Sequence, residues 1–237
     1  YVTGITDSYD LSIKGVSFDR LRSKFLIKSG YIDLYDITAY QPEGDLTGEV
    51  QLQYTQGKSI PFLQTFAIDS TADIKQIANL FGEAGIKMLA PYGYNIPPHV
   101  QLKGTLRQKD SKYDSSFDLF IDTPHSFTFN NFPLTHLTTP VFIRNKKVDL
   151  PEIRAGFAGG DLIAQAHVRD KNLDFQFALK GANFEESVKL VSKYFSTKGA
   201  GDTDKKSLFP ESELGGKLDL SLTAKGIRGD PLSYTGD

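Results

Sequence analysis

Apolar and polar side chains alternate along LTGEVQLQY, residues 46–54, and again along LDLSLTA, residues 218–224. A period of two places every second side chain on the same side of an extended chain, so each stretch predicts a β-strand with one apolar face. The same alternation recurs at residues 117–121, 127–129 and 173–179. Strands of this kind pair into an antiparallel sheet with one face toward water.

Residues typical of turns separate these strands. They stand at residues 29–30, 42–45, 109–111, 145–146, 159–161 and 170–172. Connections this short favour hairpins, and successive hairpins make a meandering antiparallel sheet.

Two segments break the strand period and predict amphipathic helices. The first is residues 70–88, where a Ser/Thr pair and Asp73 precede an apolar stripe, and where Gly85 is a candidate end. The second is residues 183–195, with Asn183 as candidate cap and acidic residues in the first turn. The predicted stripes are Ile74, Ile77, Ala78 and Phe81 in the first helix, and Val188, Val191, Tyr194 and Phe195 in the second. We expect both stripes to pack on the sheet, and a Gly-rich, polar loop at residues 196–214.

The chain also matches itself at an offset of 116 residues. The matching pairs are Leu21 and Leu137, Ile27 and Ile143, Asp33 and Asp149, Leu34 and Leu150, Ile37 and Ile153, and Ala39 and Ala155. Residues 44–46 then fall on residues 160–162, and a new strand follows each helix. The expected units are residues 1–97 and 98–214, with residues 215–237 beginning a third. Duplicated α+β domains and an open sheet that continues from unit to unit both fit; because the sequence starts and ends in strand-like residues, we expect the second, as a segment of a longer array.

Composition excludes several classes of protein. The 237 residues carry 27 Lys and Arg against 29 Asp and Glu, for a formal charge of −2, which is far from the basic balance of a nucleic-acid-binding protein. No cysteine is present, so disulfides, Cys-ligated zinc and thiol nucleophiles are excluded. No run approaches the roughly 18 consecutive apolar residues of a membrane-spanning helix.

The sequence carries no recognisable motif for catalysis or cofactor binding. His99, His125, His136 and His167 show no metal-binding spacing, and the Gly-rich residues 156–160 lack the Lys and Ser/Thr of a phosphate-binding loop. Asp118 and Asp122 imitate a hydrolytic pair, but alternation with apolar residues places them on a solvated strand face. We therefore expect no enzyme activity, cofactor or metal.

Several passages together resemble the AsmA-like proteins of Gram-negative envelopes, the group that includes TamB-type and YhdP-type members. One is the Gly-Gly-Asp-Leu hairpin at residues 159–162 with its following strand. Another is the Ala182-Asn183 cap, helix and loop that lead into GGKLDLSL, residues 215–222, and a third is TAKGIRG, residues 223–229. The resemblance covers most of the chain from about residue 10 onward.

This resemblance implies a non-enzymatic segment of a repeating β-groove, with antiparallel curved sheet units that each carry one helix. Phospholipid acyl chains would pass along the groove between inner and outer membrane in the periplasm. It also implies an inner-membrane anchor outside this segment and possible envelope protein partners. The two helices mark a departure from the family pattern, because a helix lying in the groove would interrupt lipid passage.

The larger apolar strand residues are the candidate lipid-binding residues: Leu46, Val50, Leu52, Phe117, Leu119, Ile121, Leu162, Val168, Phe175, Phe177, Leu179, Leu218, Leu220 and Leu222. At any single position, a place in an ordinary core is the more common role of such a residue. Two other functions stay open: a structural or protein-interaction module whose helices cover the sheet, and a carbohydrate-binding β protein that uses Tyr31, Tyr35, Tyr40, Tyr92 and Tyr94.

Overall fold

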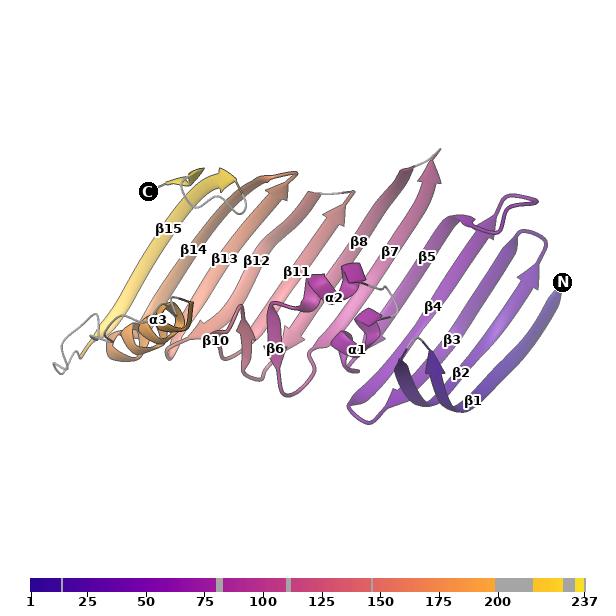
Figure 1. Cartoon of the computed structure of the whole chain (residues 1–237), viewed down its shortest axis with the longest axis horizontal. Helices are drawn as coiled ribbons and strands as arrows, with labels where there is room; N and C mark the ends of the chain where they lie inside the picture. Colours follow the sequence, from indigo (N-terminus) through magenta and orange to yellow (C-terminus); the bar gives the residue numbers. More distant parts are fainter. Residues whose placement is uncertain are drawn as a thin grey trace.

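The main feature of the chain, seen in a computed structural model, is a 13-stranded antiparallel sheet whose strands lie in chain order (Figure 1). The structure describes residues 1–13, 15–79, 83–109, 112–145, 147–198, 215–227 and 233–236. The strands of this main sheet are β1 (Val2–Ile13), β2 (Val16–Lys28), β3 (Tyr31–Gln41), β4 (Gly44–Tyr54), β5 (Pro61–Ser70), β7 (His99–Lys109), β8 (Lys112–Thr123), β11 (Leu137–Arg144), β12 (Lys147–Phe157), β13 (Gly160–Arg169), β14 (Asn172–Asn183), β15 (Lys217–Ile227) and β16 (Thr235–Gly236).

The remaining elements lie on one face of this sheet. A three-stranded sheet consists of β6 (Tyr92–Tyr94), β9 (Phe127–Phe129) and β10 (Phe132–Leu134). The helices are α1 (Ile74–Ala78), α2 (Glu83–Leu89) and α3 (Phe184–Lys198). The prediction of a mainly β chain with a large antiparallel sheet is confirmed, and the alternating stretches lie in β4, β8, β14 and β15. Residues 127–129 form a strand as predicted, but in the small sheet.

Two β-bulges occur at matching places in the main sheet. In β3 the bulge lies between Leu34 and Ile37, and in β12 it lies between Leu150 and Ile153. In each case two residues of one strand face a single residue of the next, so the bulged strand contains one extra residue. The strand stays in phase with its neighbours on both sides of the bulge. Both bulges lie in the strands that the offset of 116 aligns. Neither bulge moves the apolar side chains of its strand to the other face of the sheet.

A buried hydroxyl group accompanies each bulge. Ser23 donates to the carbonyls of Lys24 (2.9 Å) and Tyr35 (3.3 Å). Thr139, at the matching position, donates to the carbonyls of Pro140 (3.2 Å) and Glu152 (3.0 Å). Both side chains are buried, so the hydroxyl supplies the hydrogen bond that the interrupted ladder does not.

Along the strand direction, described elements form a second layer toward one end of the sheet, and the other end has no such layer in Figure 1. Near β3 and β4, Val16 and Phe18 of the β1–β2 hairpin pack on Ala39 and Leu46. Near β14, a cluster that contains Phe157 and Leu179 packs against residues of α3, β10 and β15. The partly buried members of this cluster are Phe132, Leu134, Leu162, Leu190 and Leu218. In Figure 1 α1, α3 and the small sheet lie toward this end, and α2 lies farther along, in front of the middle of the sheet.

The helix expected at residues 70–88 is instead two short helices, α1 and α2. Ser70 belongs to β5, where its hydroxyl donates to the Asp45 carbonyl (3.3 Å), so it does not cap the helix. Asp73 does, by accepting from the Lys75 amide (2.9 Å). Gly85 lies within α2 and does not end it. Phe81, assigned to the first stripe, lies outside the described residues.

The second helix is close to its prediction but longer, because α3 continues to Lys198. Asn183 caps it as expected, accepting from the Glu186 amide (2.9 Å). The inward stripe is shifted by one position: Ser187 is buried and Leu190 packs on the cluster, whereas Val191 is exposed. The side chains of Tyr194 and Phe195, and residues 199–214 of the expected loop, lie outside the described part.

The hydroxyl at the second bulge gives a stability test. Thr139→Val keeps the shape of the side chain but leaves bulge carbonyls without their donor, which costs about 1–3 kcal/mol of unfolding free energy. Thr139→Ser keeps the hydroxyl and is the matched control, with a smaller loss. Urea unfolding of both variants measures the difference, and a valine variant as stable as the serine variant would contradict this role of the hydroxyl.

Candidate functional site

A row of uncharged residues crosses the main sheet from β1 to β15. Each member is the cross-strand partner of the next, so all lie on one face. In order, the members are Gly4, Phe25, Leu34, Val50, Phe66, Gly104, Phe117, Ile143, Val148, Val168, Leu173 and Gly226. With about 4.8 Å between strands, this central row is roughly 50 Å long. We call the side of the sheet that carries it the apolar face.

The predicted lipid-binding residues all lie on the apolar face. Val50, Phe117 and Val168 belong to the central row. The others are in parallel rows on the same face, by strand alternation: Leu46, Leu52, Leu119, Ile121, Leu162, Phe175, Phe177, Leu179, Leu218, Leu220 and Leu222. Among the described cross-strand pairs from β2 to β15, no Asp, Glu, Lys or Arg falls on this face. One long apolar surface therefore contains every predicted residue.

Burial divides these residues into two groups. Leu179 is 4% exposed within the cluster against α3, and Leu162 and Leu218 pack on the same cluster. Leu220 and Leu222 are 48% and 37% exposed. The rest are half-buried between their strand neighbours. Leu179 is therefore core, whereas Leu220, its cross-strand partner in β15, is open. Phe175, nearer the other end of the strands, is partly covered by Tyr234, with ring centroids 6.1 Å apart.

Several residues of the central row were missed in the sequence. Phe25 stands in the run Phe25-Leu26-Ile27, where three consecutive apolar residues hide the period of two. Val148 lies in a strand whose alternation is broken by the bulge after Leu150. Phe66 is followed by Ala67 on the opposite face, which weakens the polar half of the pattern. Scoring each strand separately on either side of a bulge would have found them.

Aromatic rings lie over the glycine in the middle of the row. A Cβ atom on Gly104 would stand 2.3 Å from Phe66 Cζ and 2.7 Å from Phe117 Cδ1. The ring centroids of Phe66 and Phe117 are 5.8 Å apart. Gly104 thus lets two aromatic side chains from the flanking strands meet across it, which keeps the apolar surface continuous where the row lacks a side chain.

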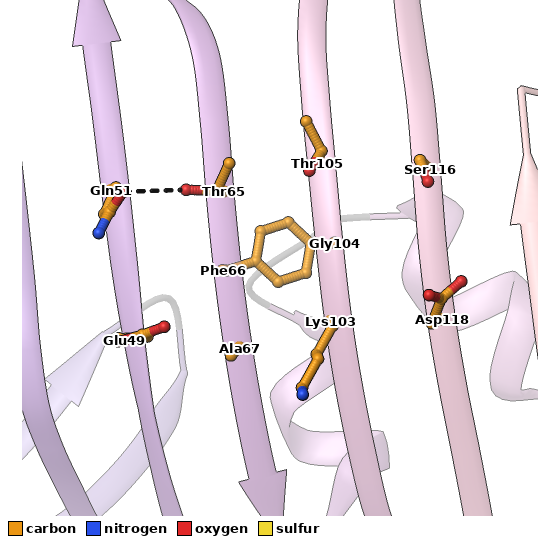
Figure 2. A pocket seen from close by; sticks show the side chains of 10 residues that line it. All are labelled: Glu49, Gln51, Thr65, Phe66, Ala67, Lys103, Gly104, Thr105, Ser116 and Asp118. Carbon is orange, nitrogen blue, oxygen red and sulfur yellow. Dashed lines mark hydrogen bonds between the residues drawn. The ribbon is translucent and has the colours of Figure 1, made fainter.

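The opposite face of the sheet is polar and carries the charges. Figure 2 shows Glu49, Lys103 and Asp118 projecting on this side of β4, β7 and β8, with the Phe66 ring at Gly104. They line a shallow depression of about 330 Å³. Asp118 is paired with Arg144 beside it. Asp118 and Asp122 thus lie on the polar side of β8, where Asp122 also accepts from the Thr138 hydroxyl (2.7 Å), and this explains why both alternate with apolar neighbours.

A second depression on the polar face, of about 560 Å³, lies near β13 to β15. His167 Nδ1 is 2.8 Å from Asp149 Oδ1, and Arg169 reaches the same oxygen at 3.3 Å. Lys225 pairs with Asp174 at 3.1 Å. These contacts satisfy one another, and they leave no side chain poised as a nucleophile with its own base.

The four histidines do not converge on a metal site. His99 Nε2 lies 2.8 Å from Asp69, and this hydrogen bond, with that of Gln101, lowers the pKa of the Asp69 carboxyl. Within the described ranges, no group of three or more His, Cys, Asp or Glu side chains is placed to hold a metal ion.

The tyrosines proposed to stack on sugars are dispersed. Tyr31, Tyr35 and Tyr40 are in β3, whereas Tyr92 and Tyr94 are in the small sheet. The Tyr92 ring packs on Phe129, with centroids 5.2 Å apart, and the Tyr94 hydroxyl donates to Asp73 (2.5 Å). Burial is the main cause that raises the pKa of Tyr94. The two tyrosines of the small sheet therefore hold it together and tie it to α1.

Comparison with known proteins gives no match: none among protein-family models, none among curated proteins and none among solved structures. Among the described residues, no helix combines the length and apolar composition needed to cross a membrane.

The crowding at Gly104 gives a test of the apolar face. Gly104→Ala forces the rings of Phe66 and Phe117 apart and is expected to lower the unfolding free energy by about 1–3 kcal/mol. Gly215→Ala is the control, because a Cβ atom there meets nothing within 4 Å. Adding Phe66→Leu to Gly104→Ala should recover part of the loss, measured as a double-mutant cycle in urea. Strict additivity of the two changes would argue against this contact.

Proposed function

We propose that this chain is a non-enzymatic lipid-handling protein that holds phospholipid acyl chains on the uncovered part of its apolar face. The observation that carries the proposal is the central row, an uncharged surface roughly 50 Å long with no second layer over much of it. A sheet of this amphipathic kind needs a helix, another sheet or a ligand over its apolar side. Covering one Val, Leu or Phe side chain contributes about 1.5–3 kcal/mol, so a ligand that covers several gains substantial affinity.

The dimensions suit acyl chains. A strand of 11 residues, such as β4, spans roughly 36 Å, whereas one leaflet of a bilayer core is about 15 Å thick. A lipid tail laid along a strand is therefore shorter than the strand itself. Neighbouring strands repeat the same surface sideways, so several tails can lie in parallel.

We further propose that the chain is a segment of an AsmA-like envelope protein, which moves phospholipid between the inner and outer membranes in the periplasm. Support comes from the matching bulges of β3 and β12 and the matching hydroxyls of Ser23 and Thr139, which favour tandem units that build one groove. On this account α1, α2 and α3 cap one side of the groove and leave its length open.

A protein-interaction module is the second candidate, and one observation favours it. β1 is an edge strand of 12 residues, and Val2, Ile5 and Tyr9 on it are exposed. An edge of this kind accepts a further strand. In one form of this alternative helices cover the whole sheet; in Figure 1 much of the sheet has no described helix in front of it.

Adjacent residues on β15 test the proposed function. Leu222→Asp puts a charge on the apolar face at an exposed position, so it should reduce bound phospholipid by about fivefold. It should change the unfolding free energy by less than about 1 kcal/mol. Ser221→Asp, with the same new charge on the other face, is the control and should retain lipid. Lipid per protein is measured by organic extraction and mass spectrometry.

Two outcomes of this experiment would contradict the proposed function. The first is the absence of stoichiometric lipid from the folded wild-type protein after exposure to phospholipid vesicles. The second is an equal loss of lipid in the Leu222→Asp and Ser221→Asp variants. Such a result would show that the new charge causes the loss whichever face carries it.

A further inference from the structure

Charge is distributed unequally between the two ends of the strands. The β2–β3, β4–β5, β7–β8, β11–β12 and β13–β14 connections all lie at one end, because successive strands are antiparallel, and Figure 1 shows this end away from α1 and α3. We call these five tips the basic rim: residues 28–31, 54–61, 107–114, 144–147 and 169–172. Its described basic residues are Lys28, Lys58, Arg107, Lys109, Lys112, Arg144, Lys147, Arg169 and Lys171, and its described acidic residues are Asp114 and Asp170. Asp110 and Lys146, of opposite charge, lie outside the described part.

The covered end has the opposite balance. Its turns and capping elements are residues 41–45, 69–79, 83–98, 122–136, 157–161, 180–192 and 215–219. The acidic residues of these segments are Glu43, Asp45, Asp69, Asp73, Glu83, Asp122, Asp161, Glu185, Glu186 and Asp219, and the basic ones are Lys75, Lys87, Lys180, Lys189 and Lys217. Among the described residues of these segments, charge is therefore separated along the strand direction; the side chains of Lys193 and Lys198 in α3 lie outside the described part.

Most rim cations are not neutralised within the protein. Arg144 pairs with Asp118, Arg169 reaches Asp149, and the Lys28 ammonium lies 4.6 Å from the centroid of the Tyr31 ring. No ion pair with a described carboxylate is present for the others. These exposed side chains are Lys58, Arg107, Lys109, Lys112, Lys147 and Lys171.

The rim cations adjoin the open end of the apolar face. Leu106 precedes Arg107 in β7, Ile143 precedes Arg144 in β11, and Val148 follows Lys147 in β12. The apolar neighbours belong to the face defined above, and Ile143 and Val148 are members of the central row. Because neighbouring residues of a strand point to opposite faces, these cations stand on the polar side of the hairpin tips, where long Lys and Arg side chains can reach past the strand ends toward a headgroup beside the apolar face.

We propose that the basic rim selects acyl lipids with anionic headgroups, and that it sets their direction on the sheet. The headgroup oxygens lie at the hairpin tips, and the tails extend along the strands toward α1 and α3. This inference rests on the proposed function for the tails and adds the class of lipid and its orientation. The lipid concerned is one held on the apolar face, not the surface of an intact bilayer.

Headgroup selectivity of the full chain is the test. The protein is incubated with vesicles that contain equal amounts of phosphatidylglycerol and phosphatidylcholine with identical acyl chains, separated from the vesicles, and extracted for mass spectrometry. The rim variant is Lys109→Glu, Lys112→Glu and Lys147→Glu together. The control variant is Lys87→Glu, Lys103→Glu and Lys180→Glu, which makes the same change of charge away from the rim.

Wild type and control should be enriched about tenfold in the anionic lipid, since one Lys beside an anionic lipid contributes a factor of about five. The rim variant should show a ratio near one with the same total lipid. High salt should reduce the enrichment and leave the total unchanged. Lipid bound without headgroup preference in the wild type, or an unchanged ratio in the rim variant, would contradict headgroup selection by the rim. Neither result would contradict the proposed function.

Two further outcomes separate this proposal from its alternatives. No bound lipid in any of the proteins overturns the proposed function and, with it, the rim. If the rim variant loses cosedimentation with vesicles while its extracted lipid keeps the wild-type ratio, the rim binds bilayer surfaces, and selection of a lipid on the apolar face is wrong.

Discussion

The phase of side-chain alternation is the constraint on which the rest of this structure depends. A slip of one residue in any strand would exchange the two faces of that strand, and the sheet would lose its division into an uncharged and a charged side. Cross-strand pairing keeps this phase from Gly4 in β1 to Gly226 in β15. The bulges of β3 and β12 each insert a residue without reversing this phase. The buried hydroxyls of Ser23 and Thr139 donate to backbone carbonyls at the two bulges.

This division of faces explains both the stability of the chain and its proposed use. The polar face is satisfied by ion pairs such as Arg144 with Asp118, and by water. In the described part of the chain, the buried clusters around Phe18 and Phe157 lie at one end of the apolar face, and near the other end the Tyr234 ring packs on Phe175. At the other end the same face meets the basic rim. The core, the proposed ligand surface and the proposed headgroup contact thus follow one another along the strands.

The fold class could be predicted because alternation in β4, β8, β14 and β15 is a local signal. The predicted lipid-binding residues share one face for the same reason. Which of them are covered could not be predicted, since Leu179 and Leu222 have the same alternation, yet only Leu179 is buried, in the cluster that includes Leu134 of β10 and Leu190 of α3. The division of the first helix into α1 and α2 and the placement of Phe127 in a small sheet were missed, because both depend on tertiary contacts.

The central claim is that acyl chains contact one face of the sheet, and photo-crosslinking at two adjacent residues of β8 tests it most directly. Leu119 lies on the apolar face and Phe120 on the polar face, and both are apolar residues. With a photoreactive amino acid at either position and phospholipid vesicles present, the account predicts a lipid adduct by mass spectrometry at residue 119 and little at residue 120. Equal adducts at both residues, or a stronger one at residue 120, would contradict it.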